Sequence, residues 1–361
     1  EFLELASIDS ISREEREMAD ALKQKLLQMG LKPYEDNAGE LIGGNAGNVI
    51  CLLEGQKDIP AVLVMAHMDT VVPGKGKKPM VEGNIIKSDG TTVLGSDDVA
   101  GIVCILEAVR TLKEENLKHG DIYMVFTVAE EIGLLGSKNL DYTRLNARYG
   151  FVLDGDGPIG TAAVKAPSHN SITAVIKGKA AHAGMAPEKG IDAIRIASEA
   201  ISNMKLGRID HETTANVGKI RGGQAVNIVC DTVEIEAETR SRDEGKLEEQ
   251  TNHMRDCLEK AARKYGGTVQ FKSEREYPAY SIDENDEIMS ILRKAADDAG
   301  VKLRLEATGG GSDTNIINGK GIKAVDLSIG MENVHSVEER IDIDNMVKAA
   351  EFLTAILKNV K

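Results

Sequence analysis

The chain has 361 residues, of which 42% are hydrophobic and 28% charged, and its formal net charge is −14. Nucleic acids attract proteins with a basic face, so this strongly acidic balance predicts no nucleic-acid partner. No apolar run approaches the roughly 20 residues that a membrane-spanning helix needs, so we expect no membrane association either. The length leaves room for two or three domains.

The first part of the chain alternates helices and strands. Ser12 and Glu15 fit a capping box at the start of a helix over residues 12–29, which Gly30 closes. The elements expected after it are strands over 48–53 and 61–66, a helix over 99–114, and strands over 121–128 and 149–153. This alternation predicts an α/β fold with a mostly parallel sheet and helices on both faces, and ligands of such sheets gather at the carboxyl ends of the strands.

The pattern changes after Pro167 and returns after Pro278. Between them we expect a strand over 171–177, a helix over 191–204, strands over 215–220 and 228–239, a helix over 246–264 and a strand over 268–275. The order β-α-β-β-α-β is that of a ferredoxin-like α+β unit. Helices over 285–299 and 346–357 and strands over 303–307 and 323–328 then resume the first pattern. The sequence therefore predicts a discontinuous domain over 1–167 and 278–361, interrupted by a second domain over 168–277.

Acidic and imidazole side chains stand where these elements end or begin. His67 and Asp69 follow one strand, Glu130 and Glu131 the next, and Asp154 a third. A loop after the strand over 323–328 carries His335, and Asp97 and Asp98 precede the helix over 99–114. Each pair alone is also typical of a cap, a turn or a solvated strand end. If the strands are parallel neighbours, however, all these side chains point into one crevice.

Several carboxylates in one crevice raise one another's pKa, and divalent cations relieve the repulsion. Two imidazoles among carboxylates favour zinc, cobalt or manganese over calcium. Counting Asp97, Glu131 and Asp154 as charged ligands favours two ions, the usual arrangement for metal-assisted hydrolysis. Glu130 is adjacent to Glu131 and points in another direction, which makes it a candidate general base.

The motifs "HMDT", "LGSDDVAG", "AEEIG", "LDGDGP", "AHAG" and "GGGSD" resemble the motif series of the M20 family of co-catalytic metallopeptidases, and within it the tripeptide aminopeptidase, or peptidase T-like, branch. The resemblance implies a zinc-peptidase-like catalytic domain over 1–167 and 278–361. It also implies that residues 168–277 form a lid or dimerisation domain. One departure is Val99, where relatives often carry lysine, and the chain is shorter than a typical tripeptidase.

The resemblance also implies roles for the strand-end residues. His67 and Asp154 would bind one metal, Glu131 and His335 the other, and Asp97 would bridge the two. Glu130 would be the base that activates water. Asp69 would hold the ring of His67 by a hydrogen bond.

Four further positions match motifs of the second domain and of the glycine loop. His182 in "AHAG" resembles the histidine that stabilises the oxyanion, which in dimeric relatives comes from the partner subunit. Asn227, Arg240 and Gly310 resemble residues that contact the substrate.

We therefore expect a metallopeptidase that removes an amino acid from short peptides, with zinc as the first choice of metal and cobalt or manganese as alternatives. Four dispersed cysteines fit a reducing compartment such as the cytoplasm, and a homodimer through the lid is compatible with its strands. An N-acyl amino acid deacylase or a carboxypeptidase remains an open alternative. A metal-binding scaffold without turnover is the alternative from another class.

Overall fold

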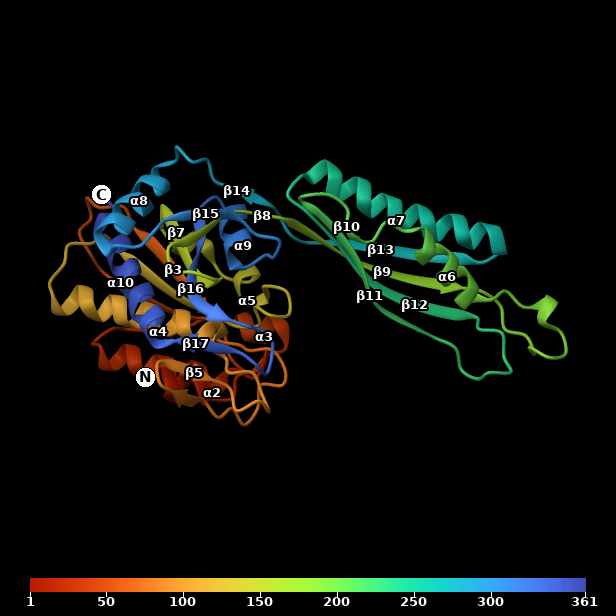
Figure 1. The fold of residues 1–361 in the computed structure, drawn as a ribbon, viewed down its shortest axis with the longest axis horizontal. Helices are drawn as coiled ribbons and strands as arrows, with labels where there is room; N and C mark the ends of the chain where they lie inside the picture. Colours follow the sequence, from red (N-terminus) through yellow and green to blue (C-terminus); the bar gives the residue numbers. More distant parts are fainter. The chain divides into compact units, whose positions relative to one another are not determined.

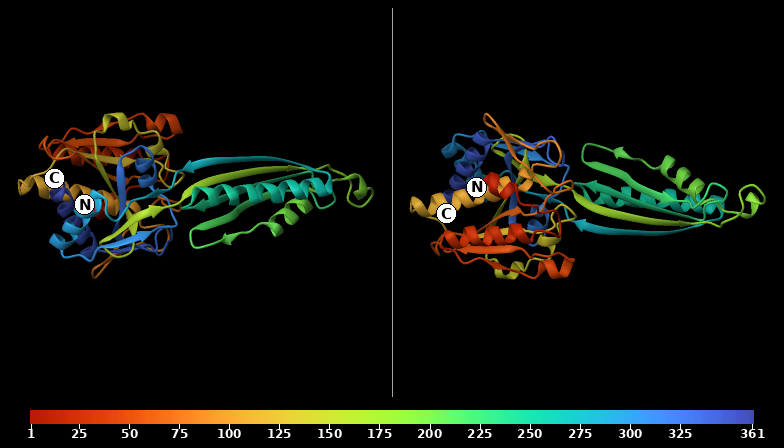
Figure 2. Two further views of the ribbon diagram at one scale, coloured as in Figure 1. Left: turned by 90° about the horizontal axis from the view of Figure 1, so that it is seen from above. Right: turned by 90° about the horizontal axis from the view of Figure 1, so that it is seen from below.

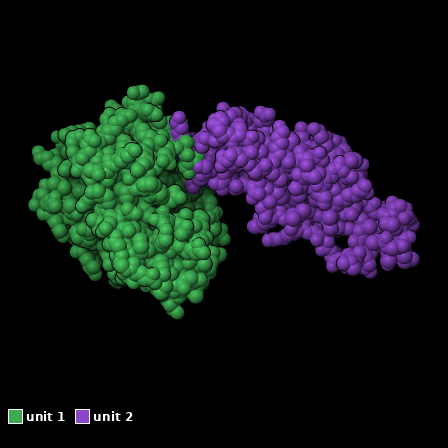
Figure 3. Space-filling model, viewed as in Figure 1, with its two compact units in different colours: residues 1–164, 281–308, 312–361 green, residues 165–280, 309–311 purple.

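The computed structural model describes all 361 residues, and they divide into two compact units (Figure 3). Unit 1 comprises residues 1–164, 281–308 and 312–361, and unit 2 comprises residues 165–280 and 309–311. The predicted domain boundaries lie within a few residues of these divisions, except that the prediction assigned residues 309–311 to the first domain. None of the helices combines the length and apolarity that crossing a bilayer requires.

Four parallel strands form the centre of the sheet in unit 1 (Figure 1). In spatial order they are β6 (Ile122–Thr127), β3 (Val62–His67), β7 (Tyr149–Asp156) and β16 (Lys323–Glu332). All six residues of β3 are buried, as expected for a parallel strand that is covered on both faces. The mostly parallel α/β fold is thus confirmed.

Short strands extend this sheet on both sides, and they pair antiparallel. They are β1 (Tyr34–Glu35) and β2 (Val49–Leu53) beyond β6, and β17 (Arg340–Asp342), β5 (Ile85–Lys87) and β4 (Met80–Glu82) beyond β16. A side branch contains β8 (Thr161–Ala166), β14 (Tyr280–Ser281) and β15 (Arg304–Ala307).

Helices cover both faces of the central strands (Figure 1). Leu63 and Met65 of β3 pack with Ile317 of α9 (Asp313–Gly319) on one face. Since side chains alternate along a strand, the residues between them face α4 (Ser96–Glu114), which packs against β3 and α10 (Ile343–Asn359). The remaining helices of unit 1 are α1 (Phe2–Ala6), α2 (Arg16–Gln28), α3 (Ala38–Ile42), α5 (Leu135–Lys138), η1 (Tyr142–Arg144) and α8 (Glu287–Ala299).

Unit 2 has a five-stranded antiparallel sheet with two helices packed on it. The strands in spatial order are β10 (Gly207–Arg208), β11 (Thr213–Gly222), β12 (Thr232–Ser241), β9 (Ser168–Lys177) and β13 (Thr268–Tyr277). The helices are α6 (Ala193–Asn203) and α7 (Glu244–Tyr265), with a short η2 (Pro187–Lys189) before them. In both views of Figure 2 the long α7, coloured teal, runs alongside the strands of this unit. Apart from the short β10, the order is the expected β-α-β-β-α-β.

The prediction for the first long helix is wrong at its amino end. Helix α2 begins at Arg16, not at Ser12. The Ser12 hydroxyl donates to Asp69 Oδ2 at 2.6 Å, and the buried Glu15 carboxylate accepts from the main-chain nitrogens of Arg13 and Ala129. Ser12 thus binds a distant loop. Glu15 occupies the N-cap position of α2, but its side chain makes no capping hydrogen bond to the helix.

Candidate metal centre

The central strands of unit 1 bring the predicted ligands to one edge of the sheet. His67 is the last residue of β3, Asp154 lies near the end of β7, and Glu131 follows β6. His335 lies in the turn between β16 and β17, and Asp97 lies at the start of α4. Because β6, β3, β7 and β16 are parallel neighbours, their carboxyl ends meet at this edge.

The carboxylate of Asp97 lies between the two imidazoles. Its Oδ1 is 2.8 Å from His67 Nε2, and its Oδ2 is 3.1 Å from His335 Nε2. Asp154 Oδ1 lies 3.4 Å from His67 Nε2, and Glu131 Oε2 lies 3.0 Å from His335 Nε2. These five residues form two groups of three that share Asp97, and within each group the ligand atoms lie within 4.8 Å of one another.

The pKa values of most groups in this cluster are shifted toward the protonated form. Burial raises the pKa of Asp154 and of Glu130 well above the ordinary carboxyl range. Burial lowers the pKa of His67, but Asp154 and Asp97 outweigh it, and the net shift is well upward. Hydrogen bonds to Asp97 and Glu131 raise the pKa of His335 to about 10. Such a cluster binds protons tightly, and cations would take their place.

The chemistry of these residues fits divalent transition metals. Each group offers one imidazole nitrogen and two carboxylate oxygens, a set that suits zinc, cobalt or manganese. Glu131 Oε1 is buried without a hydrogen-bond partner, so a ligand atom of this group still has bonding capacity. Buried polar atoms without partners are rare in proteins, and a missing ion is one of their ordinary explanations.

Asp69 contacts the cluster through both its main chain and its carboxylate. His67 Nδ1 donates to the main-chain oxygen of Asp69 at 2.9 Å. The carboxylate of Asp69 lies farther from Nδ1, at 3.6 Å. With Nδ1 donating, Nε2 presents its lone pair to the cluster. The carboxylate instead accepts from the main-chain nitrogens of Glu130 and Glu131, at 2.9 and 3.2 Å, and from Ser12. Asp69 therefore holds the base candidate and a ligand candidate together.

Further buried acids lie behind the cluster, and sequence reasoning missed their roles. Asp98 accepts from the main-chain nitrogens of His67 and Gly101, each at 3.1 Å, and the peptide bond between Asp97 and Asp98 is cis. Asp326 accepts from the main-chain nitrogen of Asp154 at 3.2 Å, and burial raises its pKa to about 7. An aspartate inside the apolar run "KAVDLSIG" was the available signal for Asp326.

Asp313 is the last residue of the motif "GGGSD", in which the sequence predicts a role only for the glycines. Its Oδ2 accepts from Thr127, the last residue of β6, at 2.6 Å, and burial raises its pKa to about 6.

The residues predicted in unit 2 fall into two places. Ala183 donates to the main-chain oxygen of Asn227 at 2.9 Å, so the exposed His182 and Asn227 lie on adjacent loops. Asn227 precedes the ten-residue β12, and Arg240 lies near its carboxyl end, roughly 26 Å along the strand from its first residue, Thr232. There it pairs with Glu238 at 3.0 Å.

The glycine segment 309–311, which contains Gly310, belongs to the same end of unit 2 as Arg240. A Cβ on Gly311 would lie 2.3 Å from the Tyr277 ring, so only glycine fits against this tyrosine. The Tyr277 ring in turn contacts the ring of His169 at a tilted angle, and His169 pairs with Arg240 across β9 and β12. Arg240 and Gly310 are thus brought toward one cluster, and His182 and Asn227 toward another.

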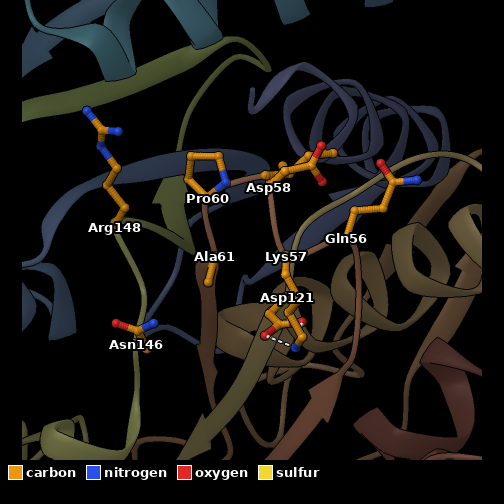
Figure 4. A pocket seen from close by; sticks show the side chains of 9 residues that line it. Gln56, Lys57, Asp58, Pro60, Ala61, Asp121, Asn146 and Arg148 are labelled. Carbon is orange, nitrogen blue, oxygen red and sulfur yellow. Dashed lines mark hydrogen bonds and ion pairs between the residues drawn. The ribbon is translucent and has the colours of Figure 1, made fainter.

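A surface hollow of about 400 Å³ lies at the amino ends of β3 and β6 (Figure 4). Pro60, Ala61, Asp121 and Arg148 are among its lining residues, and Lys57 pairs with Asp121 at 2.7 Å. None of the predicted site residues lines it, and the candidate metal ligands lie at the opposite, carboxyl edge of the sheet.

Comparison with known proteins decides the family. The model of Peptidase family M20/M25/M40 matches residues 63–359, which include both groups of candidate ligands. The chain belongs to the M20 peptidase family. It is therefore a metallopeptidase, as the motif series indicated.

This M20 peptidase resembles relatives and solved structures over nearly its whole length. It is 47% identical to the uncharacterized protein YqjE of Bacillus subtilis, with 99% of this chain and 96% of the relative covered. The structure of aminopeptidase PepT from Bacillus cereus is 44% identical, with a TM-score of 0.90 and coverage of 99% and 96%. A tripeptidase structure from Staphylococcus aureus is 41% identical, with a TM-score of 0.95 and the same coverage. The predicted resemblance to the peptidase T-like branch is thus confirmed.

Proposed function

We propose that this M20 peptidase is a tripeptide aminopeptidase that uses two divalent cations, with zinc as the favoured metal. The observation that carries the proposal is the position of Asp97, whose two oxygens each lie within 3.1 Å of a different imidazole. A carboxylate placed in this way suits a bridge between two ions, with His67 and Asp154 on one and Glu131 and His335 on the other. The likeness to an aminopeptidase and to a tripeptidase supports the substrate class.

The bound cations would polarise the scissile carbonyl and make water a better nucleophile. Glu130 is assigned the proton transfer. It is 8% exposed, its main-chain nitrogen is fixed by Asp69, and burial raises its pKa, so its carboxyl group is ready to hold a proton between steps. It would take the proton from the attacking water and pass it to the leaving amine.

Residues of unit 2 are proposed to bind the substrate and the oxyanion. His182 Nδ1 accepts from the main-chain nitrogens of Gly184 and Met185, both at 3.2 Å. Its exposed Nε2 is then the donor, as an oxyanion contact requires. Asn227, Arg240 and Gly310 are proposed to contact the peptide, with the Arg240 guanidinium suited to a carboxylate.

We also propose a homodimer through unit 2. Met185 and Val226, which flank His182 and Asn227, are 81% and 104% exposed, and Ile228 is 41% exposed. Clustered exposed apolar side chains are typical of a protein interface. Sedimentation velocity would test the dimer.

The source of His182 can be tested by mixing two inactive variants, Glu130→Gln and His182→Ala, and letting subunits exchange. Recovered activity in the mixture would show that His182 serves the partner's centre, and no recovery would assign it to its own. A reducing compartment such as the cytoplasm is proposed because all four cysteines are free.

The decisive experiment measures release of the amino-terminal residue from di-, tri- and tetrapeptides after chelation and after addition of zinc, cobalt or manganese. We expect metal-dependent cleavage that is fastest on tripeptides. The matched control is an N-acetylated tripeptide, which an aminopeptidase leaves intact. Preferred cleavage of the acetylated peptide would favour the deacylase alternative, and no hydrolysis of any peptide would favour a scaffold.

A further inference from the structure

Glu339 closes the turn that carries His335. It lies just before β17 and is 1% exposed. Its main-chain nitrogen donates to the oxygen of Ser336 at 3.2 Å, and its main-chain oxygen accepts from Ser88 at 3.1 Å. The turn is otherwise irregular: Asn333 and His335 adopt φ angles of 55° and 61°, which side-chain-bearing residues rarely occupy. Its conformation therefore depends on contacts with the rest of unit 1.

The carboxylate of Glu339 reaches the turn that carries Asp97. Oε2 accepts from the main-chain nitrogen of Gly95 at 2.8 Å. Oε1 accepts from the Ser96 hydroxyl at 2.6 Å and from the main-chain nitrogen of Asp97 at 3.0 Å. Gly95 is the N-cap residue of α4 and has no side chain of its own. Glu339, from a distant part of the chain, accepts from two main-chain N–H groups at the start of this helix.

A buried cation accompanies this carboxylate. Lys77 is 4% exposed, and its Nζ has no hydrogen-bond partner. Nζ lies 3.0 Å from the position that a Cβ on Gly95 would take. Burial lowers the pKa of Lys77 to about 8, against the opposing effect of Glu339. A buried carboxylate that accepts three hydrogen bonds beside a cation is held in a fixed position.

We infer that Glu339 is a positioning residue that ties the His335 turn to the Asp97 turn and thereby sets the affinity of the second cation site. This inference rests on the proposed two-cation function. Asp97 and His335 are two of the three candidate ligands of that site, and Glu339 connects the segments that carry them.

The first site shares only Asp97 with this connection, and its other two candidate ligands have supports that do not involve Glu339. The His67 ring is held by the main-chain oxygen of Asp69, and the main-chain nitrogen of Asp154 is held by Asp326. Loss of the Glu339 carboxylate should therefore weaken the second ion much more than the first.

The test is calorimetric titration of zinc or manganese into the metal-free, full-length protein. The wild type should bind two ions per chain. In Glu339→Gln one oxygen becomes an NH₂ group that cannot accept, so we expect the second ion to bind roughly 10–100-fold more weakly and the first within a few-fold of the wild type. The matched control is Glu338→Gln, a change of the exposed neighbouring glutamate, which should leave both affinities unchanged.

Thermal unfolding of the metal-free variants separates positioning from folding. If Glu339→Gln does not fold, Ser96→Ala removes only one of the three donors and should still weaken the second ion selectively, by a smaller factor. Unchanged affinity for the second ion, or equal weakening of both ions, would overturn the inference. A wild type that binds fewer than two ions would instead overturn the proposed function, and the inference with it.

Discussion

Replacement of Asp69 by alanine should damage both stability and catalysis. The carboxylate is fully buried and accepts three hydrogen bonds, from Ser12 and from the main-chain nitrogens of Glu130 and Glu131. A buried donor left without its acceptor costs about 1–3 kcal/mol, and these three donors share one acceptor group, so their costs are not additive. We expect the free energy of unfolding of the metal-free protein to fall by about 3–5 kcal/mol.

Urea unfolding in the presence of a chelator, followed by circular dichroism, measures this loss without the contribution of bound ions. Asp58→Ala, which removes an exposed carboxylate at the opposite edge of the sheet, should change the free energy of unfolding by less than about 0.5 kcal/mol. In Asp69→Asn, which keeps one acceptor oxygen, the loss should be intermediate. The reasoning would be refuted if Asp69→Ala unfolded within about 1 kcal/mol of the wild type and kept its kcat.

Three other predictions follow from the geometry. Glu130→Gln should lower kcat by about 10²–10⁴ while calorimetry still finds two bound ions, and an unchanged kcat would remove Glu130 from the mechanism. The hydrogen bond from Arg16 lowers the pKa of Glu35 from 4.5 to about 2, so its contribution to stability is present above pH 4.5 and is lost as the pH falls toward 2. The free energy of unfolding should therefore differ between pH 6 and pH 3 by about 1–2 kcal/mol less in Glu35→Gln than in the wild type. An equal difference in both proteins would contradict this prediction. Ile317→Ala should cost about 2–5 kcal/mol in urea unfolding because Ile317 is fully buried against β3, whereas Ile194→Ala, at a half-exposed position, should cost much less.

The central strands could be predicted from the sequence because their signal is local. An apolar run such as "VLVMA" followed by His67 marks both a buried strand and its polar end. Parallel neighbours then share an edge by geometry, so convergence of His67, Asp154 and Glu131 follows from the order of the elements. The short β4 and β5 were missed because strands of three residues carry no periodicity to detect.

The supporting residues could not be predicted because their partners are distant in sequence. Ser12 and Glu15 have the spacing of a capping box. In the folded chain, however, Ser12 donates to Asp69, and Glu15 accepts from the main-chain nitrogen of Ala129. Glu339 stands 244 residues from Gly95, and no local pattern relates the two. Hydrogen bonds of this kind are decided by tertiary packing.

The stretch that precedes α2 has a practical consequence for anyone who shortens this chain. Ser10 accepts a main-chain hydrogen bond from Thr70 at 2.9 Å, Ile11 pairs with Thr70, Ser12 binds Asp69, and Glu15 holds Ala129. Removal of the residues up to and including Glu15 would thus remove hydrogen bonds that support the candidate metal centre, while all five candidate ligands stay in the product. Such a truncated enzyme should lose activity out of proportion to the few amino acids removed.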